Sequence, residues 1–184
     1  KSHLFKIRKL FCPKCAITPK RNGAGIISYH IQLRNNPTCK NLLGLGITPR
    51  KTAKLKQMRI PKKFLADFIR GYFDGDGSVY IYKVNGTKQI KAEFISASWE
   101  FIHSLIKDLC NSLDIPRKKL YERIDKSGVR IPVYYSCFYI EDCKKLSDFM
   151  YGTSSKISLS RKRNIFQKWN QVPRRKYIRR ILEA

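Results

Sequence analysis

The sequence predicts an α/β (α+β) fold of amphipathic helices and antiparallel strand pairs, and three observations support this. An apolar segment with helical spacing runs from Phe64 to Phe73 and continues directly into Asp74-Gly75-Asp76-Gly77. A strand-like run follows at once and turns at Asn85-Gly86, the dipeptide most typical of a tight hairpin. The order of hairpin and then helix recurs along the chain, which indicates an internal repeat.

The apolar helix is expected to begin at Pro61, because the fixed φ and missing N–H of proline suit a first helical turn. Gly71 and Gly75 are four residues apart, so they share one face where another backbone could approach closely. Asp74 and Asp76 then sit at the helix C-terminus, where the macrodipole disfavours anions. A bound metal ion would resolve this conflict, although Asp-Gly pairs are also ordinary turn formers.

A calcium-binding EF-hand loop does not fit this segment. Counted from Asp74, the sixth position is Val79 where glycine is needed, and the twelfth is Asn85 where glutamate is needed. The combination of apolar helix, paired glycines, DGDG and strand instead resembles the signature of the LAGLIDADG homing endonucleases. The matching residues are Ile69, Gly71, Phe73, Asp74, Asp76 and Gly77, while Arg70 and Gly75 replace alanines and Tyr72 replaces a leucine.

Members of that family pack two motif helices at the centre of a two-lobe, pseudo-twofold fold with antiparallel, saddle-shaped DNA-binding sheets. The resemblance implies that Asp76 is the catalytic and metal-binding aspartate, and that the backbone carbonyl of Gly75 shares the metal. Gly71 and Asp74 would lie at the motif-helix interface, with Asp74 also serving the helix end. The implied cofactor is Mg²⁺, for which Ca²⁺ substitutes without cleavage.

Strands are expected at 78–83, 89–96, 119–124 and 129–140, with helices at 101–109 and 141–151. The first sixty residues repeat the later part of this order, with a helix from Leu4 to Leu10, strands at 16–19 and 26–34, and a helix near Leu42. This pattern indicates a tandem ββ-helix-ββ-helix unit whose first copy is cut short.

Three domains follow from this interpretation. Residues 1–58 form a partial N-terminal LAGLIDADG lobe without its motif helix and first hairpin, 59–155 form the C-terminal lobe, and 156–184 form a basic C-terminal extension. A site with one aspartate per motif needs two motifs, so this chain supplies half of it. The first motif is expected from a segment missing before Lys1 or from another chain.

The composition favours a nucleic-acid partner. Lys and Arg number 39 against 13 Asp and Glu, a net charge of +26 that a polyanion would neutralise. The hydrophobic content of 42% excludes a disordered basic tail. With no apolar run long enough to span a bilayer and no secretory signal, we expect no membrane partner and an intracellular location, in a bacterial cytoplasm or an organelle. Cys12 and Cys15 form a lone CxxC without a second pair for zinc, so reduced, structural thiols are expected.

Strand alternation predicts the DNA-facing residues. If Val79, Ile81, Ile90, Ala92 and Phe94 point to the core, their neighbours form a polar, aromatic and basic face suited to a major groove. This expected face comprises Ser78, Tyr80, Tyr82, Lys88, Gln89, Lys91 and Glu93, extended by Arg123 and Arg130 and, in the first copy, by His30, Gln32 and Arg34. An ordinary solvated sheet face is the alternative, and Glu93 could instead position an active-site water.

The C-terminal stretch from Lys156 holds ten Lys or Arg and one acidic residue, Glu183. It is expected to contact the DNA backbone without reading sequence, with a localisation signal as the alternative. Lys51 and Lys156 lie at comparable places in the two copies, so either could approach the cleaved phosphates.

The sequence therefore predicts an intron-encoded homing endonuclease that hydrolyses double-stranded DNA at a long, asymmetric site. An RNA maturase and a non-cleaving DNA-binding regulator on the same fold are the alternatives. The presence of both Asp74 and Asp76 favours cleavage, because RNA binding needs no metal-binding carboxylate.

Overall fold

The structure is a computed structural model that describes residues 2–32, 36–47, 53, 55–125, 131–152 and 157–172. Arg34, Lys51, Arg130 and Lys156, which the sequence singled out, lie outside the described residues, as does the chain after residue 172. Within the described part, antiparallel sheets combine with helices, which confirms the predicted α+β class.

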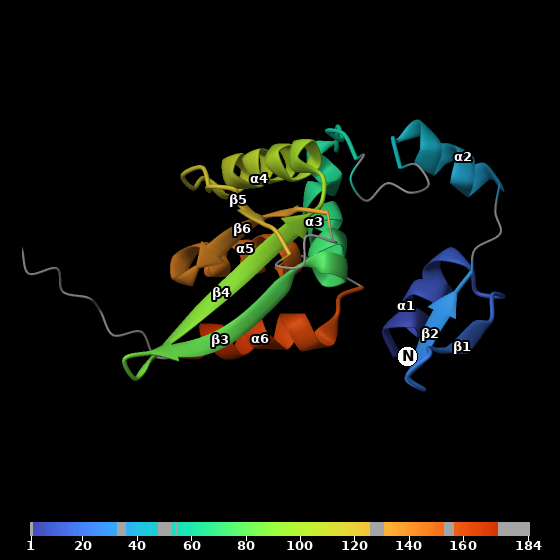
Figure 1. Cartoon of the computed structure of the whole chain (residues 1–184), viewed down its shortest axis with the longest axis horizontal. Helices are drawn as coiled ribbons and strands as arrows, with labels where there is room; N and C mark the ends of the chain where they lie inside the picture. Colours follow the sequence, from blue (N-terminus) through green and yellow to red (C-terminus); the bar gives the residue numbers. More distant parts are fainter. Residues whose placement is uncertain are drawn as a thin grey trace, which may run out of the picture.

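The N-terminal segment contains a helix, a strand pair and a second helix. Its elements are α1 (Ser2–Phe11), β1 (Ile17–Arg21), β2 (Ile27–Ile31) and α2 (Asn36–Gly44). The strands are antiparallel, with Ile17 opposite Ile31 and Arg21 opposite Ile27. They lie together with α1 beside the larger part of the molecule (Figure 1). None of the residues of α1 is buried, so this segment contributes little to the hydrophobic core.

Cys12 and Cys15 follow α1 in a tight turn. The amide of Cys15 donates to the carbonyl of Cys12 over 2.9 Å, and the two Cα atoms lie 5.4 Å apart. The structure joins these residues in a disulfide, so the expectation of free thiols is wrong for this pair. Cys39, Cys110, Cys137 and Cys143 are free thiols as expected.

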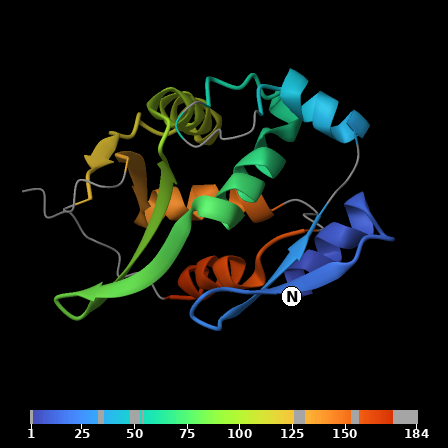
Figure 2. The same ribbon diagram turned by 45° about the vertical axis from the view of Figure 1, so that its right-hand side comes forward.

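The larger part of the molecule is built on a four-stranded antiparallel sheet in the order β3-β4-β6-β5. Its strands are β3 (Ser78–Val84), β4 (Thr87–Ser96), β5 (Tyr121–Arg123) and β6 (Val133–Tyr139). Asn85 and Gly86 connect the first two with φ angles of 47° and 76°, which is the backbone that an Asn-Gly hairpin turn requires. This β3–β4 hairpin extends beyond the helices (Figures 1 and 2).

Four helices surround the core of this lobe. They are α3 (Lys62–Asp76), α4 (Trp99–Leu113), α5 (Ile140–Tyr151) and α6 (Ser160–Asn170). Helices α4 and α5 contact β4 and β6, while α6 contacts β3 and α5. The order α4, β5, β6, α5 is the same as the order α1, β1, β2, α2, as the predicted repeat requires.

The predicted alternation of the β3–β4 hairpin is confirmed on its inward side. Val79, Ile90, Ala92 and Phe94 are buried beneath the helices together with Phe138 of β6. The ring of Phe94 lies 5.0 Å from that of Phe73 in α3, so the end of the motif helix is packed directly on the sheet. Among the described residues, no helix is both long and apolar enough to cross a membrane.

Helix α6 corrects the expected role of the C-terminal stretch. The sequence assigned everything from residue 156 to a basic extension on DNA, but Phe166 and Trp169 of α6 are buried in the core. Phe166 lies 5.8 Å from the ring of Phe73 and 5.9 Å from that of Tyr151. The apolar residues of this amphipathic segment are few among its many cations, so the sequence did not predict that it is buried. Residues 157–172 pack as part of the same lobe.

Gly77, which ends α3, has no room for a side chain, whereas Gly75 has. A Cβ at Gly77 would lie 2.4 Å from the Phe73 ring and 2.8 Å from the Phe73 carbonyl oxygen, while one at Gly75 meets nothing within 4 Å. We expect Gly77→Ala to lower the free energy of unfolding by about 2 kcal/mol through overpacking. Gly75→Ala, the matched control, should leave it within about 1 kcal/mol or raise it, since alanine favours helix. Urea unfolding of both variants measures this, and equal stabilities would contradict the prediction.

Candidate nucleic-acid interface and metal-binding helix end

The outer face of the four-stranded sheet carries tyrosines and cations. Tyr80, Tyr121 and Tyr139 are each close to half exposed. The strand registers place on this face Ser78, Tyr80 and Tyr82 of β3, Gln89, Lys91 and Glu93 of β4, Tyr121 and Arg123 of β5, and Tyr135, Cys137 and Tyr139 of β6. The three tyrosines of β5 and β6 extend a surface that the sequence predicted for the first hairpin and Arg123.

Glu93 lies on this outer face, as the sequence predicted, but its side chain is covered instead of exposed. It is only 8% exposed, because cationic neighbours cover it. Its carboxylate pairs with Lys91 at 3.1 Å and with Arg123 at 3.4 Å, and accepts a long contact of 3.8 Å from the Cys137 thiol. The alternation identified the face of the sheet correctly, but exposure depends on side chains from a neighbouring strand.

The cations around Glu93 are held in position. The Arg123 guanidinium lies 4.4 Å from the centre of the Tyr135 ring, and the Lys91 ammonium lies 5.9 Å from it. Partial burial works against the charged form of Lys91, but hydrogen bonds to Glu93 and Cys137 raise its pKa above the ordinary value. Lys91 therefore remains cationic on a surface whose aromatic groups can stack.

The exposed end of α3 lies directly beside this face. Asp76 and Gly75 are exposed, and Ser78, the first residue of β3, follows two residues later. Gly71 is also exposed, and a Cβ built on it or on Gly75 meets no atom within 4 Å. Among the residues that the structure describes, the side of α3 that the two glycines share is therefore open.

Asp74, expected at the motif-helix interface as well as at the helix end, faces the interior of its own lobe. It is 9% exposed and accepts hydrogen bonds from the Tyr151 hydroxyl at 3.0 Å and the Leu159 amide at 2.7 Å. Burial and then the neighbouring Asp74 carboxylate raise the pKa of Tyr151, which keeps the phenol a donor. Of the two expected roles, the contacts of Asp74 fit the one at the helix end. Its carboxylate does not lie on the open side of α3.

Lys162 of α6 completes the last turn of α3, and the sequence did not single it out. Its ammonium donates to the carbonyls of Phe73 at 2.6 Å and Asp74 at 3.0 Å, and also to the carbonyl of Gly77. Lys162 is 2% exposed, so its ammonium has almost no contact with water and is hydrogen-bonded by these three carbonyls instead. Nothing in the local sequence distinguishes it from its basic neighbours Arg161 and Arg163.

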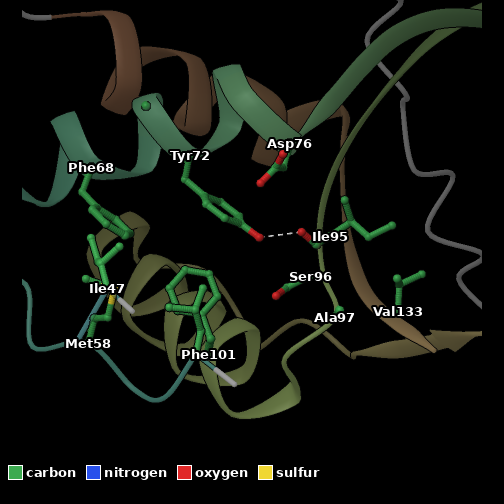
Figure 3. Close-up of a pocket in the computed structure, with 12 residues that line it drawn as sticks. Ile47, Met58, Phe68, Tyr72, Asp76, Ile95, Ser96, Ala97, Phe101 and Val133 are labelled. Atoms are coloured by element: carbon green, nitrogen blue, oxygen red, sulfur yellow. Dashed lines mark hydrogen bonds between the residues drawn. The ribbon is translucent and has the colours of Figure 1, made fainter. Parts of the chain in front are cut away.

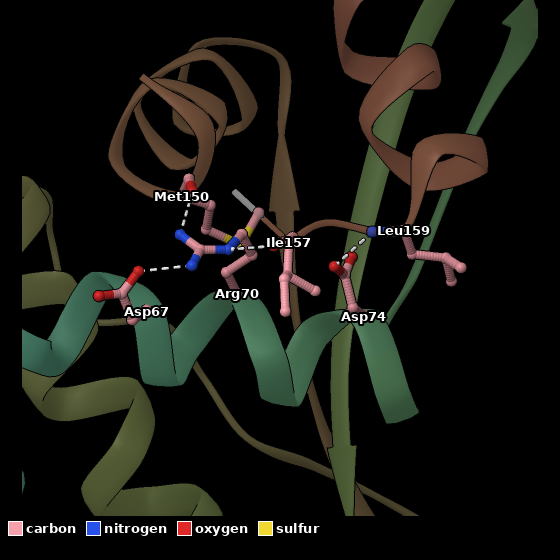
Figure 4. A network of polar contacts seen from close by, with 6 residues as sticks. All are labelled: Asp67, Arg70, Asp74, Met150, Ile157 and Leu159. Atoms are coloured by element: carbon pink, nitrogen blue, oxygen red, sulfur yellow. Dashed lines mark hydrogen bonds and ion pairs between the residues drawn. The ribbon is translucent and has the colours of Figure 1, made fainter. Parts of the chain in front are cut away.

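Arg70, which replaces an alanine of the family signature, fastens α3 to α5 (Figure 4). Its guanidinium donates to the carbonyls of Met150 at 3.0 Å and Ile157 at 2.9 Å, and pairs with Asp67 at 2.5 Å. Met150 lies in the last turn of α5, where a cation is favoured by the helix dipole.

An apolar cavity of about 690 Å³ opens along the glycine side of α3 (Figure 3). Asp76 stands at one end of it, and Tyr72 projects into it and donates to the Ile95 carbonyl over 2.5 Å. The remaining lining residues are Ile47, Leu55, Met58, Phe68, Gly71, Ser96, Ala97, Phe101 and Val133. Ile95, Ser96 and Val133 lie at the end of β4 and the start of β6, so the cavity extends from α3 to that end of the sheet.

A metal ion would find a partial ligand set here. No three His, Cys, Asp or Glu side chains within the described ranges come together as a metal site. Asp76 offers an exposed carboxylate and Gly75 a backbone carbonyl, which suits Mg²⁺ because that ion keeps several waters and takes few protein ligands. The two groups would therefore fit as part of the ligand set of such an ion.

The remaining predicted residues are separated from this arrangement. His30 is exposed on β2 and shares a 3.1 Å hydrogen bond with the Thr18 hydroxyl, and Gln32 is exposed just after that strand. His30 belongs to the two-stranded sheet, which among the described residues is separate from the larger sheet, and Gln32 lies directly after its second strand. Lys88 is exposed near the tip of the β3–β4 hairpin, opposite Lys83.

Comparison with known proteins places a known domain in this chain. Residues 63–137 match the family model of the LAGLIDADG-like domain, so this part of the chain carries such a domain. The chain is also similar to the crystal structure of the LAGLIDADG homing endonuclease I-GzeII in complex with its DNA target, with 13% identity and a TM-score of 0.42. That match covers 74% of this chain but only 43% of the other protein. No curated protein sequence matches the chain.

Tyr72 makes the stability of this site dependent on alkaline pH. Burial raises its pKa from 10.0 to about 12, a nearby hydrogen bond from Ser96 opposes the shift, and Asp76 adds to it. A raised folded-state pKa contributes stability that is complete below the unfolded value and is lost as the pH rises through the folded value. The advantage of the wild type over Tyr72→Phe should therefore be constant below pH 10.0 and shrink towards pH 12.

Urea unfolding of both proteins across this pH range measures the effect. Comparing the two proteins cancels the titration of the other tyrosines, Tyr151 among them. A difference that stays constant through pH 12 would show that Tyr72 ionises as it does in the unfolded chain.

Proposed function

We propose that this protein is a divalent-metal-dependent DNA endonuclease that hydrolyses phosphodiester bonds at a long, asymmetric site. One observation carries the proposal. An exposed aspartate, Asp76, ends the motif helix where an open sheet face of tyrosines and cations begins. A scissile phosphate of a duplex lying on that face would come close to Asp76.

The charge of the chain supports a nucleic-acid substrate. A net charge of +26 on 184 residues would bind the phosphate backbone strongly, with an affinity that falls as salt rises. On the sheet face, Arg123 and Lys91 are fixed by Glu93, so they present charge in set directions. Antiparallel strands with such side chains suit a major groove, where polar contacts to base edges carry specificity.

The chemistry assigns separate tasks to the residues at the helix end. Asp76 would hold the metal with its exposed carboxylate, and the Gly75 carbonyl would share it. The metal, when bound, would neutralise phosphate charge and activate water. The open side of α3 at Gly71 would receive the second motif helix, whose own aspartate would complete the site.

An RNA maturase is the second candidate, and the exposed tyrosines favour it. Unpaired bases stack on aromatic side chains, and three tyrosines close to half exposed on one sheet face offer such a platform. A regulator that binds DNA without cutting would use the same face. Neither function needs the Asp76 carboxylate to be present.

Cleavage by an Asp76→Asn variant tests the endonuclease. The protein would be assayed with Mg²⁺ on a library of candidate sites. We expect Asp76→Asn to lower the cleavage rate at least about 100-fold, because the metal loses its charged ligand, while DNA binding in Ca²⁺ is retained. Glu100→Gln, which removes one exposed carboxylate from α4, is the matched control and should cleave normally.

The wild type would then decide between the candidates. If it binds DNA tightly but does not cut in Mg²⁺ or Mn²⁺, the endonuclease proposal is wrong. Tighter binding to intron RNA than to duplex DNA would support the maturase.

Arg123 tests the sheet face as the binding surface. Arg123→Ala should weaken DNA binding by about 1–3 kcal/mol if the residue reads a base, or reduce the salt dependence by about one phosphate contact if it does not. Lys144→Ala removes an exposed cation from α5, on the other side of the sheet, and serves as the control. Fluorescence anisotropy over a series of salt concentrations measures both. Equal effects of the two substitutions would rule out this face as the interface.

A further inference from the structure

We propose that Lys162 is a positioning residue for Asp76: from α6, its ammonium fixes the last turn of α3, and with it the Asp76 carboxylate and the Gly75 carbonyl. This inference rests on the proposed function. It assigns to α6, which has no part in the family signature, a direct influence on the metal-binding end of the motif helix.

The hydrogen bonds of Lys162 use its full capacity. A lysine ammonium has three N–H donors, and the three carbonyls of Phe73, Asp74 and Gly77 accept them. These residues stand on both sides of Gly75 and Asp76 in the chain. Because the turn is held before and after these two residues, their own carbonyl and carboxylate have little freedom to change direction.

The charge of Lys162 also answers the conflict that the sequence raised. Carboxylates at a helix C-terminus are disfavoured by the dipole, and α3 ends with two of them, Asp74 and Asp76. The buried ammonium of Lys162 places a positive charge against the terminal carbonyls of α3. The motif helix can therefore end in DGDG before any metal binds.

Helix α6 is itself firmly attached, so Lys162 acts from a fixed base. Phe166, one turn further along α6, is fully buried against Phe73 and Tyr151. At the start of α6, the amide of Leu159 donates to the Asp74 carboxylate (Figure 4). Asp74 and Lys162 thus hold the inner side of the turn, while Asp76 is left exposed on the outer side.

Hydrogen exchange of the Gly77 backbone amide is the direct test. The Gly77 amide donates to the Phe73 carbonyl over 2.9 Å, so its exchange reports whether the last turn of α3 is closed. In wild-type protein this amide should exchange slowly. In Lys162→Met it should exchange at least about 10-fold faster, while the amide of Leu109 in the core of α4 keeps its rate. Lys168→Met, which removes an exposed lysine from the same helix, should change neither amide.

Two further variants separate positioning from general stability. Lys162→Arg keeps the positive charge, but a planar guanidinium cannot direct three donors at three carbonyls that converge on one point, so Gly77 exchange should again rise. Phe166→Leu weakens the packing of α6 without touching the polar contacts. It should lower the melting temperature while leaving Gly77 exchange close to that of the wild type.

The cleavage assay then measures the effect on the reaction. Lys162→Met and Lys162→Arg should lower kcat by about 10- to 100-fold through misplacement of Asp76, with DNA affinity in Ca²⁺ unchanged. Phe166→Leu, assayed well below its melting temperature, should retain kcat.

Several results would overturn the proposal. The first is fast exchange of the Gly77 amide in the wild type. The second is a Lys162→Met variant whose Gly77 exchange rate or kcat equals that of the wild type. The third is a Phe166→Leu variant that loses as much kcat as Lys162→Met does. Absence of cleavage by the wild type would instead refute the proposed function. In that event the exchange rate of Gly77 still decides whether Lys162 fixes this turn.

Discussion

The structure depends on three helices that supply hydrogen-bond partners for the terminal backbone groups of one another. Lys162 of α6 binds the terminal carbonyls of α3, Arg70 of α3 binds the Met150 carbonyl near the end of α5, and Asp74 of α3 accepts from the amide that precedes α6. Each charge has the sign that the adjoining helix dipole favours. Helix ends carry backbone groups without intrahelical partners, and burying them unpaired would be costly. These contacts therefore allow three helices to end inside one compact core.

This arrangement divides the motif helix into two sides with different tasks. The inner side is saturated: Arg70 and Asp74 are buried and hydrogen-bonded, and Phe73 is packed on Phe94 and Phe166. On the outer side, a Cβ at Gly71 would meet no described atom within 4 Å, and Asp76 is exposed beside the cavity. A second helix and a metal would therefore meet a surface whose support is complete within this lobe.

The sheet separates support from recognition in a similar way. Its inner face is apolar and packed beneath the helices, whereas its outer face is formed by tyrosines and by cations gathered around Glu93. A buried carboxylate between Lys91 and Arg123 limits the directions that these long side chains can take. Such order lowers the entropy lost when they bind a phosphate or a base edge.

The sequence by itself determined the features that depend on neighbouring residues. These are the helix that runs into DGDG, the Asn85-Gly86 turn, and the alternation that buries Ile90 and Phe94, all of which follow from local spacing. Only the tertiary structure decided that Lys162 turns inward from a run of three basic residues, that Arg123 covers Glu93, and that Asp74 faces α6. In each case the partner is far away in the chain, from 30 residues between Arg123 and Glu93 to 89 between Lys162 and Phe73. Periodicity tells which face a side chain occupies, but not what that face meets, because that depends on how the helices and strands dock.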